Sequence, residues 1–196
     1  MRILIFSCKP KHQYKIVRTL YQVKELTDMS RLDEIFQLRV RAYEHSDQRP
    51  YINSATFPKG FYDELDNKCS HFIIENEDRI IACARLIRLR SLSQIPFYKL
   101  KTRVLSSDSS WFWYYSRIAI DPDYMKRGLS SLIDEYIIGQ LKGQEFHLVI
   151  LAKVKVEYYR KNHGFKLIET INNYSVPEYP FSKQLPTQLL IKNLSE

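Results

Sequence analysis

The sequence predicts an α/β fold in which a sheet is flanked by helices. Residues 111–120 are aromatic and β-branched, which is the composition of a buried strand. The segment 129–141 that follows them carries apolar residues at helical spacing. Two further strands are indicated at 71–75 and 79–89, because a short polar connection separates them as in a hairpin. Strand and helix patterns therefore occur along the same chain.

The length and composition favour one domain. A chain of 196 residues with 44% hydrophobic residues can bury one sizeable core. We therefore expect a single domain over residues 1–196, with 1–16 as a candidate N-terminal extension. No stretch approaches the roughly 20 apolar residues of a membrane span, which predicts no stable membrane insertion. The apolar start at 1–6 is interrupted by Lys9 and Lys11 before a signal-peptide core of about 7–15 residues could form.

The cysteines and histidines give no framework for disulfides or metals. Cys8, Cys69 and Cys83 are an odd number at irregular spacing. This pattern predicts reduced thiols and a cytoplasmic protein. The histidines show no paired spacing typical of metal ligands, so we expect no metal in the site.

The formal net charge is +8, and Lys and Arg are dense at 9–18, 85–90, 99–103 and 153–161. Such a surface suits an anionic partner, such as nucleic acid, the phosphates of CoA or an acidic carrier protein, or it only keeps the chain in solution. The aromatic residues lie in apolar segments and do not alternate with Lys and Arg on a stacking face. Nucleic acid is therefore disfavoured as a partner.

The first third of the chain is predicted to contain two short strands and one helix. Residues 1–7 and 17–23 have strand character around a polar connection. The side chains of 27–30 can cap a helix, and 32–40 give that helix an apolar side. Residues 44–60 are polar and contain prolines, so they are predicted to form a loop over one end of the sheet.

The strand at 111–120 leads into a turn and a helix. A simple alternation along this strand places Trp113, Tyr115, Arg117 and Ala119 on one face. The turn is marked by Asp121-Pro122-Asp123, and Gly128 and Ser130 stand at the start of the helix. A helix N-terminus presents unpaired N–H groups and the positive end of the helix dipole, an arrangement that suits a pyrophosphate.

The last third of the chain continues the same mixture of elements. An apolar strand is predicted at 147–152, followed by a short helix that ends in the segment 158–165. Further strands are predicted at 166–171 and around 188–191.

Two motifs resemble those of the GNAT acyltransferase superfamily. Met125-Lys126-Arg127-Gly128-Leu129-Ser130 is similar to its acyl-CoA-binding motif, Arg/Gln-x-x-Gly-x-Gly/Ala, with Gly128 as the matching glycine and with Met125 and Ser130 departing from the pattern. Tyr158-Tyr159 before Gly164-Phe165 is similar to its second motif, an aromatic-Tyr pair followed by Gly-Phe. The resemblance implies a mixed, mostly antiparallel sheet flanked by helices, with a V-shaped split between the strands 111–120 and 147–152.

The same resemblance implies roles for single residues. The main chain of Ile118, Ala119 and Ile120 is expected to hold the pantetheine arm of an acyl-CoA or acyl-phosphopantetheine co-substrate, with no tightly bound cofactor. The phosphates are expected at Lys126, Arg127, Gly128, Leu129 and Ser130. Tyr159 is expected to donate a proton to the departing thiolate; core packing is its alternative role.

A narrower resemblance, from about Leu32 to Leu190, is to the acyl-homoserine-lactone synthases and the related N-acyl amino acid synthases. The similar segments are Leu38–Tyr43, Asp63–Asp66, Cys69–Phe72, Ala84–Leu86 and Ser116-Arg117. Those enzymes take long acyl chains from acyl carrier protein, and the resemblance implies catalytic roles for Ser116 and Arg117. They usually have Glu two residues before the Ser-Arg pair, where this chain has Tyr114. This departure argues against lactone synthesis from S-adenosylmethionine and leaves N-acylation of another amine open.

Four charged residues are candidates for binding the amine acceptor: Arg39, Asp63, Asp66 and Arg85. Asp63 and Asp66 are one helical turn apart, so a short helix would place both carboxylates on one side. Arg85 falls in an apolar strand, where an unpaired charge is costly, so it is predicted to pair with one of these carboxylates. Such a cluster either binds substrate or holds the loop to the sheet.

Three functions are compatible with these features. The first is an N-acyltransferase that moves an acyl group from an acyl carrier protein or acyl-CoA thioester to a primary amine of a small acceptor, such as an amino acid. The second is a GNAT N-acetyltransferase that uses acetyl-CoA. The third is a non-enzymatic basic binding module, against which the placement of the aromatic residues argues.

Overall fold

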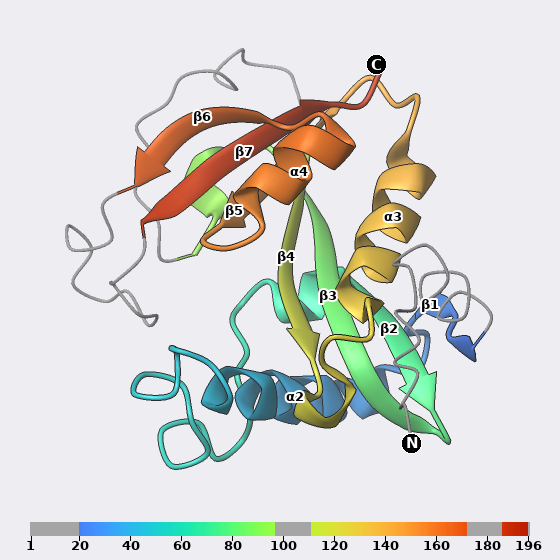
Figure 1. Cartoon of the computed structure of the whole chain (residues 1–196), viewed down its shortest axis with the longest axis vertical. Helices are drawn as coiled ribbons and strands as arrows, with labels where there is room; N and C mark the ends of the chain where they lie inside the picture. Colours follow the sequence, from blue (N-terminus) through green and yellow to red (C-terminus); the bar gives the residue numbers. More distant parts are fainter. Residues whose placement is uncertain (1–19, 97–110, 172–185, 196) are drawn as a thin grey trace, which may run out of the picture.

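The computed structural model describes residues 20–96, 111–171 and 186–195. The strands are β1 (Val23–Glu25), β2 (Ser70–Asn76), β3 (Arg79–Leu89), β4 (Phe112–Ile120), β5 (His147–Ala152), β6 (Lys166–Ile171) and β7 (Thr187–Asn193). The helices are α2 (Leu32–Glu44), α3 (Leu129–Leu141) and α4 (Val156–His163), with short 3-10 turns η1 (Met29–Arg31), η2 (Asp66–Lys68), η3 (Leu92–Gln94) and η4 (Pro122–Tyr124). Figure 1 shows their arrangement.

Some of the sequence-based expectations fall outside the described residues. These are the strand at 1–7, the candidate extension at 1–16 and Cys8. The strand expected at 17–23 is described only from Leu20 onward, and there the strand begins later, at Val23. Within the described ranges, every helix is too short or too polar to cross a membrane.

The strands form one seven-stranded sheet in the order β1-β2-β3-β4-β5-β7-β6. Neighbouring strands are antiparallel except β4 and β5, which run parallel at the centre of the sheet. A parallel pair needs a crossover connection, and α3 supplies it between these two strands. The prediction of a mixed, mostly antiparallel sheet flanked by helices is therefore confirmed.

The two central strands separate after a short paired stretch. They pair only from Phe112 opposite His147 to Tyr115 opposite Ile150. Beyond Tyr115, β4 continues for residues 116–120 while it remains paired to β3 on its other edge. The V-shaped split predicted between these strands is confirmed, and one edge of β4 is open along it.

A β-bulge at Arg117 changes which side chains of β4 share a face. Arg117 has a φ of 58°, and the partners on β3 jump from Arg85 opposite Ser116 to Cys83 opposite Ala119. One extra residue inverts the alternation of a strand. The expected face, with Arg117 and Ala119 beside Trp113 and Tyr115, is therefore wrong. Ser116 and Arg117 both point to the side of α2.

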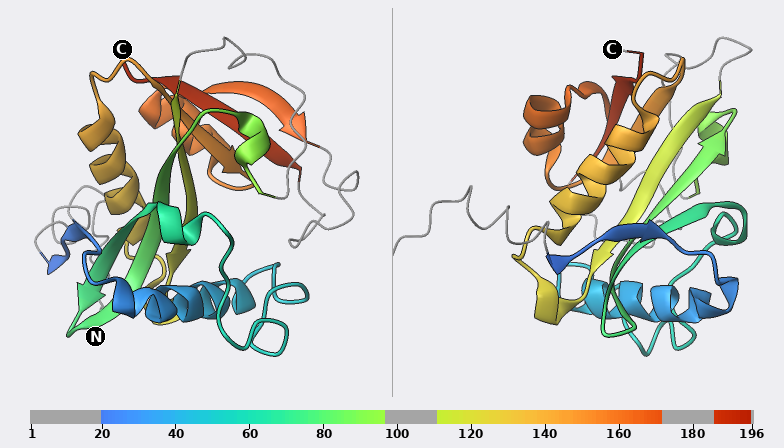
Figure 2. Two further views of the ribbon diagram at one scale, coloured as in Figure 1. Left: turned by 180° about the vertical axis from the view of Figure 1, so that it is seen from behind. Right: turned by 90° about the vertical axis from the view of Figure 1, so that its right-hand side faces the viewer.

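Each face of the sheet is covered by a helix with its own hydrophobic cluster. Ile133 and Ile137 of α3 pack with residues such as Phe72 on one face. Ile35 and Leu38 of α2 pack with residues such as Ile73 on the other, since neighbouring residues of a strand point to opposite faces. Figure 2 shows α3 and α4 on the same side of the sheet.

The turns follow from local sequence. The β2–β3 hairpin closes through Glu77 and Asp78, both at positive φ (50° and 63°), which is the geometry of the tight hairpin turn that matches strand twist. In the loop at 44–60, Ile52 is fully buried, and a Cβ at Gly60 would come within 2.4 Å of the Phe36 Cβ. This loop therefore packs tightly against α2.

Candidate active site

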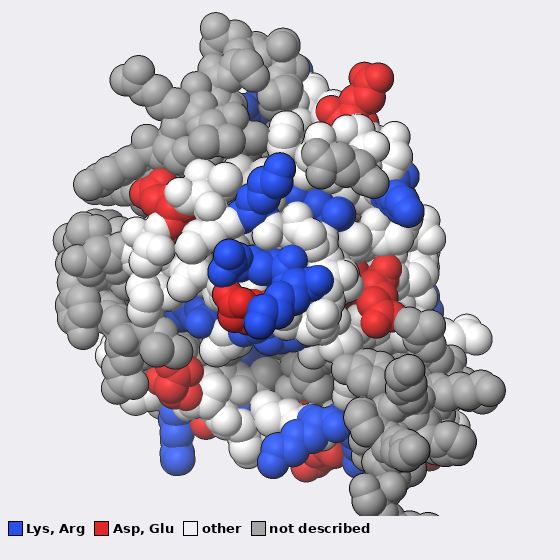
Figure 3. Space-filling view, turned by 45° about the horizontal axis from the view of Figure 1, so that its top comes forward, with Lys and Arg blue, Asp and Glu red and all other residues white. Residues whose placement is uncertain are grey.

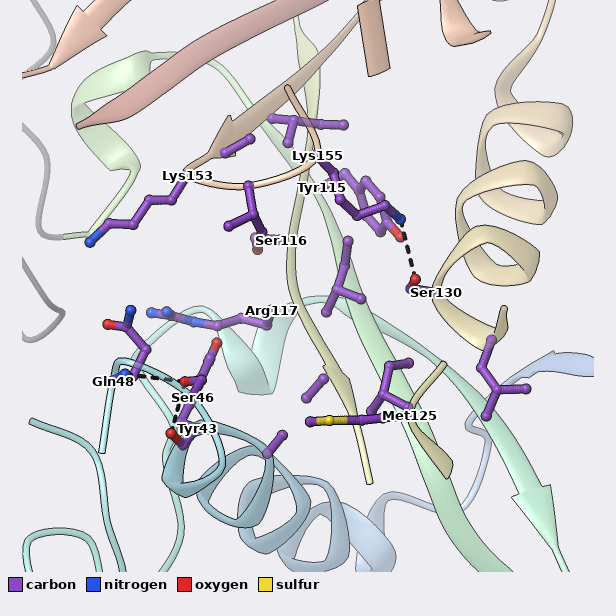
Figure 4. Close-up of a pocket in the computed structure, with 18 of the residues that line it drawn as sticks. Tyr43, Ser46, Gln48, Tyr115, Ser116, Arg117, Met125, Ser130, Lys153 and Lys155 are labelled. Carbon is purple, nitrogen blue, oxygen red and sulfur yellow. Dashed lines mark hydrogen bonds between the residues drawn. The ribbon is translucent and has the colours of Figure 1, made fainter. Parts of the chain in front are cut away.

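A cavity of about 720 Å³ occupies the split between β4 and β5. Its walls come from the open half of β4, the end of β5, the start of α3 and the C-terminal end of α2 (Figure 4). The predicted site residues that line it are Ser116, Arg117, Ile118, Ala119, Ile120, Lys126, Gly128, Leu129, Ser130 and Tyr159. The cavity thus joins the predicted phosphate turn to the side of the sheet that carries α2.

The open edge of β4 presents main-chain groups to this cavity. The N–H of Asp121 donates to the carbonyl of Ile81 on β3, at 2.8 Å. Because main-chain groups in a strand point alternately to its two edges, those of Ile120 and Ile118 are directed to the split. Ala119, expected with them, has its main chain directed to β3 but still lines the cavity.

The segment between η4 and α3 forms a tight turn at the mouth of the cavity. Lys126 and Gly128 both have left-handed backbone conformations, with φ of 61° and 81°. Gly128 is the N-cap of α3, so the unpaired N–H groups of the first helical turn begin here. Arg127, expected at the phosphates, donates to the carbonyl of Asp123 (3.0 Å) and lies 4.6 Å over the ring of Tyr124. It is not among the residues that line the cavity.

Tyr159 lies at the other end of this wall and is almost fully buried, with 2% exposure. Its hydroxyl donates to Asp134 Oδ1 at 3.0 Å, and the hydroxyl of Tyr115 donates to the same oxygen at 2.8 Å. Burial and the nearby Asp134 carboxylate raise the pKa of both phenols well above their usual value. Both tyrosines are therefore protonated at neutral pH.

Asp134 is a functional candidate that the sequence analysis missed. Its carboxylate is fully buried, and Oδ2 accepts a hydrogen bond from the Lys155 ammonium at 2.6 Å. Lys155 also donates to Ser130 Oγ at 3.2 Å, so it links the start of α4 to the first turn of α3 (Figure 4). The sequence did contain a signal for Asp134: it is a carboxylate between Ile133 and Ile137, on the apolar side of the predicted helix, and a buried charge needs a partner.

The structure brings together the charged residues that were expected at the acceptor site, and Arg85 pairs with Asp63 and Asp66 as predicted. We call Arg39, Asp63, Asp66, Arg85 and Arg117 the ionic cluster. Arg85 lies 2.6 Å from Asp63 and 3.1 Å from Asp66, measured from Nη1 to the nearest carboxylate oxygen. Arg39 lies 2.9 Å from Asp66, and Arg117 lies 2.5 Å from Asp63. The cluster ties α2, β3, β4 and the loop before β2 to one another.

Most of the ionic cluster is sealed from solvent. The side chains of Arg39 and Arg85 have no exposed surface, and those of Asp63 and Asp66 are 5% and 1% exposed. Only Arg117 of the cluster lines the cavity, together with Ser116, whose hydroxyl accepts from Arg85 at 3.1 Å. Burial alone would raise the pKa of Asp63, but Arg117 and Arg85 outweigh it and hold that pKa well below its usual range.

Three potential metal ligands also meet next to the ionic cluster. Among the described residues, Asp66, Cys69 and His71 place ligand atoms within 4.8 Å of one another. Burial raises the pKa of the Cys69 thiol to about 12, and the Asp66 carboxylate already faces Arg39 and Arg85. Two neighbouring guanidinium groups disfavour a further cation here.

Polar side chains close the α2 end of the cavity, and the sequence analysis did not single them out for this role. They are Tyr43, Ser46, Asp47, Gln48 and Lys153. Burial lowers the pKa of Lys153 to about 8, and Asp47 partly opposes this shift. Figure 4 shows Lys153, Gln48 and Arg117 on the same side of the cavity, away from α3.

The fold and the site together define a class of protein. A sheet splits between two parallel central strands, and a helix N-terminus, which favours an anion, lies at the mouth of the split. Residues 32–165 match the acetyltransferase (GNAT) family. The chain belongs to this family, and it is an acyltransferase.

Solved structures support the fold. FeeM, an N-acyl amino acid synthase from uncultured soil microbes, has a TM-score of 0.61 at 14% identity, over 90% of this chain and 92% of that one. The ribosomal-protein-S18-alanine N-acetyltransferase from Escherichia coli has a TM-score of 0.55 at 16% identity, over 90% of this chain and 95% of that one. Arabidopsis thaliana Naa50, in complex with a CoA bisubstrate analogue, has a TM-score of 0.57 at 12% identity, over 89% of this chain and 99% of that one. None of the curated proteins matches the sequence at a significant level.

Proposed function

We propose that the protein transfers an acyl group from a CoA or acyl carrier protein thioester to the primary amine of a small acceptor, with amino acids as the first candidates. One observation carries the proposal. The open edge of β4 lines a cavity that runs from the N-terminus of α3 to the polar end of α2. A donor arm can enter at α3, and an acceptor can approach from α2.

The chemistry needs a neutral amine, an activated carbonyl and a leaving thiol. The amine attacks the thioester carbonyl, and the oxyanion that forms needs a hydrogen-bond donor. Main-chain N–H groups on the open half of β4 are our candidates for this donor, next to the bulge at Arg117. The tetrahedral intermediate then collapses and the C–S bond breaks. The thiolate takes a proton from an acid, and the proton that the attacking nitrogen loses restores that acid. Tyr159 remains our candidate for that acid, and Ser116 and Arg117 remain candidates for positioning the reacting groups.

The acceptor is proposed to bind at the polar end of the cavity. Arg117 and Lys153 place two basic groups there, which suits an acceptor that carries a carboxylate as well as an amine. The similarity to an N-acyl amino acid synthase supports the same class of acceptor. Arg39, Asp63, Asp66 and Arg85 would act indirectly, because they hold Arg117 and the adjoining loop in place.

The choice of donor depends on the charges around the mouth of the split. Lys126 and Arg127 are exposed there. Lys155 is paired with Asp134, and Arg160 and Lys161 are paired with Glu157, so part of the basic charge is neutralised. Figure 3 shows acidic side chains between the basic ones on the face that it presents. This pattern supports CoA as a donor at least as well as an acidic carrier protein.

The alternative is an N-acetyltransferase that uses acetyl-CoA. Two similarities support it as well as the similarity to FeeM supports the first candidate: one to the ribosomal-protein-S18-alanine N-acetyltransferase, and one to Naa50 in complex with a CoA bisubstrate analogue. In that case the small acyl group would leave the polar end of the cavity free for a larger acceptor.

Steady-state rates with purified protein separate these possibilities. The donors are acetyl-CoA, a long-chain acyl-CoA and the same chain on acyl carrier protein, each at low and high salt. The acceptors are an amino acid and its decarboxylated amine, for example tyrosine and tyramine. We expect the amino acid to be preferred; a preference for acetyl-CoA with no discrimination for the carboxylate would favour the alternative. A carrier-protein preference that shrinks as salt rises would identify that donor.

A further inference from the structure

We propose that Asp134 is a positioning residue for the donor: it holds the Lys155 ammonium at the first turn of α3, where Lys155 binds a phosphate of the donor. The inference rests on the proposed function, because it assigns residues to the phosphate end of the same cavity. Lys155 connects the β5 side of the split to the predicted phosphate turn through its hydrogen bond to Ser130.

The position of Lys155 is set from two sides. Its Nζ lies 3.2 Å from Ser130 Oγ and 2.6 Å from Asp134 Oδ2. Ser130 belongs to the first turn of α3, where the N–H of Ser131 donates to the carbonyl of Gly128, and the N–H groups of Leu129 and Ser130 precede the first intrahelical bond. A phosphate that accepts from those N–H groups would lie next to Ser130 Oγ, and so next to the ammonium.

The ammonium can serve a ligand without leaving Asp134. An ammonium has three N–H donors, and the bonds to Asp134 and Ser130 use two of them. Its side chain is 30% exposed and lines the cavity, whereas Asp134 is fully buried. The carboxylate is therefore unable to reach a ligand itself, but it fixes where the charge of Lys155 lies.

The backbone supports the same placement. Lys155 has a left-handed conformation, with φ of 61°, at the N-cap of α4. Non-glycine residues in this region are strained and persist where the surroundings hold them. Here the surroundings include the bonds to Asp134 and Ser130 and the ring of Tyr158, 4.4 Å from Nζ.

The assignment differs from a general steering role for basic residues. Steering would depend on total charge, so Lys155 and an exposed lysine of the same helix would contribute alike. A positioned phosphate contact would instead depend on Lys155 and on Asp134, and only for ligands that carry a phosphate. Lys161, which is 76% exposed and pairs with Glu157, is the matched control.

The test is calorimetric binding of CoA and of pantetheine, which lacks every phosphate, to wild type and to Lys155→Met, Asp134→Asn and Lys161→Met. We expect Lys155→Met to weaken CoA binding about tenfold, as for one charge-assisted contact, and to leave pantetheine binding unchanged. Asp134→Asn should weaken CoA binding. The double variant, with both Asp134→Asn and Lys155→Met, should bind CoA no more weakly than Lys155→Met alone. Lys161→Met should bind CoA as wild type does.

Two results would overturn the inference. Equal losses of affinity for CoA and for pantetheine in Lys155→Met would mean that Lys155 acts at the thiol end of the donor or on the fold. Unchanged CoA affinity in Lys155→Met would show that Lys155 makes no contact with a phosphate. Melting curves identify a variant that does not fold, and Lys155→Arg then replaces Lys155→Met: it keeps the charge and should retain most CoA affinity. Wild type that binds neither CoA nor an acyl carrier protein would contradict the proposed function itself.

Discussion

Arg117 donates a hydrogen bond of 2.5 Å to the Asp63 carboxylate while its own backbone lies in the left-handed region, with φ of 58°. The bulge that this conformation creates lies on the open half of β4, where the donor arm is proposed to bind. The pair therefore connects the ionic cluster to the shape of the site.

Replacing Arg117 by Met should destabilise the protein and slow turnover. The change leaves Asp63 with one guanidinium fewer in a nearly sealed site, and breaking a buried pair typically costs about 3–5 kcal/mol. Urea unfolding measures this loss. Arg160→Met is the control, because its pair with Glu157 is exposed and should be worth about 1 kcal/mol or less. A loss below about 1 kcal/mol for Arg117→Met would show that the pair does not hold the bulge.

Acid should weaken the protein through the same cluster. Opposing burial, the neighbouring arginines hold the pKa values of Asp63 and Asp66 below their usual range, so the unfolded chain binds protons first as pH falls. The stabilisation is fully present above the unfolded pKa of about 4 and is lost progressively as pH falls toward the folded pKa values.

Unfolding free energies at pH 7, 5, 4 and 3 check this dependence. Below pH 4, each carboxylate should lower the free energy of unfolding by up to about 1.4 kcal/mol for each pH unit of acidification. Asp63→Asn should be less stable at pH 7 and should show a shallower decline. Equal slopes for the two proteins would exclude Asp63 as a source of acid sensitivity.

Gly128→Ala should impair donor binding more than it impairs folding. The residue has φ of 81° at the predicted phosphate turn, and a Cβ there would strain the turn by about 1–2 kcal/mol. Gly143→Ala is a matched control, because Gly143 has φ of 84° and a Cβ there would meet no atom within 4 Å. The two variants should lose similar stability, while only Gly128→Ala should lose CoA affinity. Equal CoA affinity in both would argue against a phosphate at this turn.

Tyr159→Phe tests the proton donor. If the Tyr159 hydroxyl protonates the leaving thiolate, kcat should fall about 100-fold or more. Tyr115→Phe removes a hydrogen bond to the same oxygen of Asp134 and is the control for a purely structural effect. Similar, small losses of kcat in both variants would assign Tyr159 to the packing of α4, where its ring contacts Phe165.

The fold was largely predictable from the sequence, because its main elements have strong periodic patterns. The helix at 129–141 and the strands at 147–152 and 166–171 have the predicted bounds. The faces of β4 were not predictable, since nothing in the composition of that strand marks a bulge at a non-glycine residue. Simple alternation therefore placed Arg117 on the wrong side.

The site was predictable where a motif or a misplaced charge marked it. Arg85 in an apolar strand led to its pairing with Asp63 and Asp66, as the structure shows. The polar end of the cavity could not be foreseen, because Gln48 and Lys153 line the same cavity only after the loop at 44–60 and the segment after β5 fold together. The extent of burial of Arg39 and Arg85 is likewise a tertiary property.

The most direct measurement is mass spectrometry of extracts from cells that express wild type and, in parallel, Gly128→Ala. A new N-acyl amine identifies the acyl chain and the acceptor at once, which no assay with a chosen substrate can do. We predict an N-acylated small amine with a free carboxylate in the wild-type extract, and its loss or strong decrease with the variant. Extracts with no N-acyl species, from cells in which the folded protein is abundant, would contradict acyl transfer to a small amine at the split between β4 and β5.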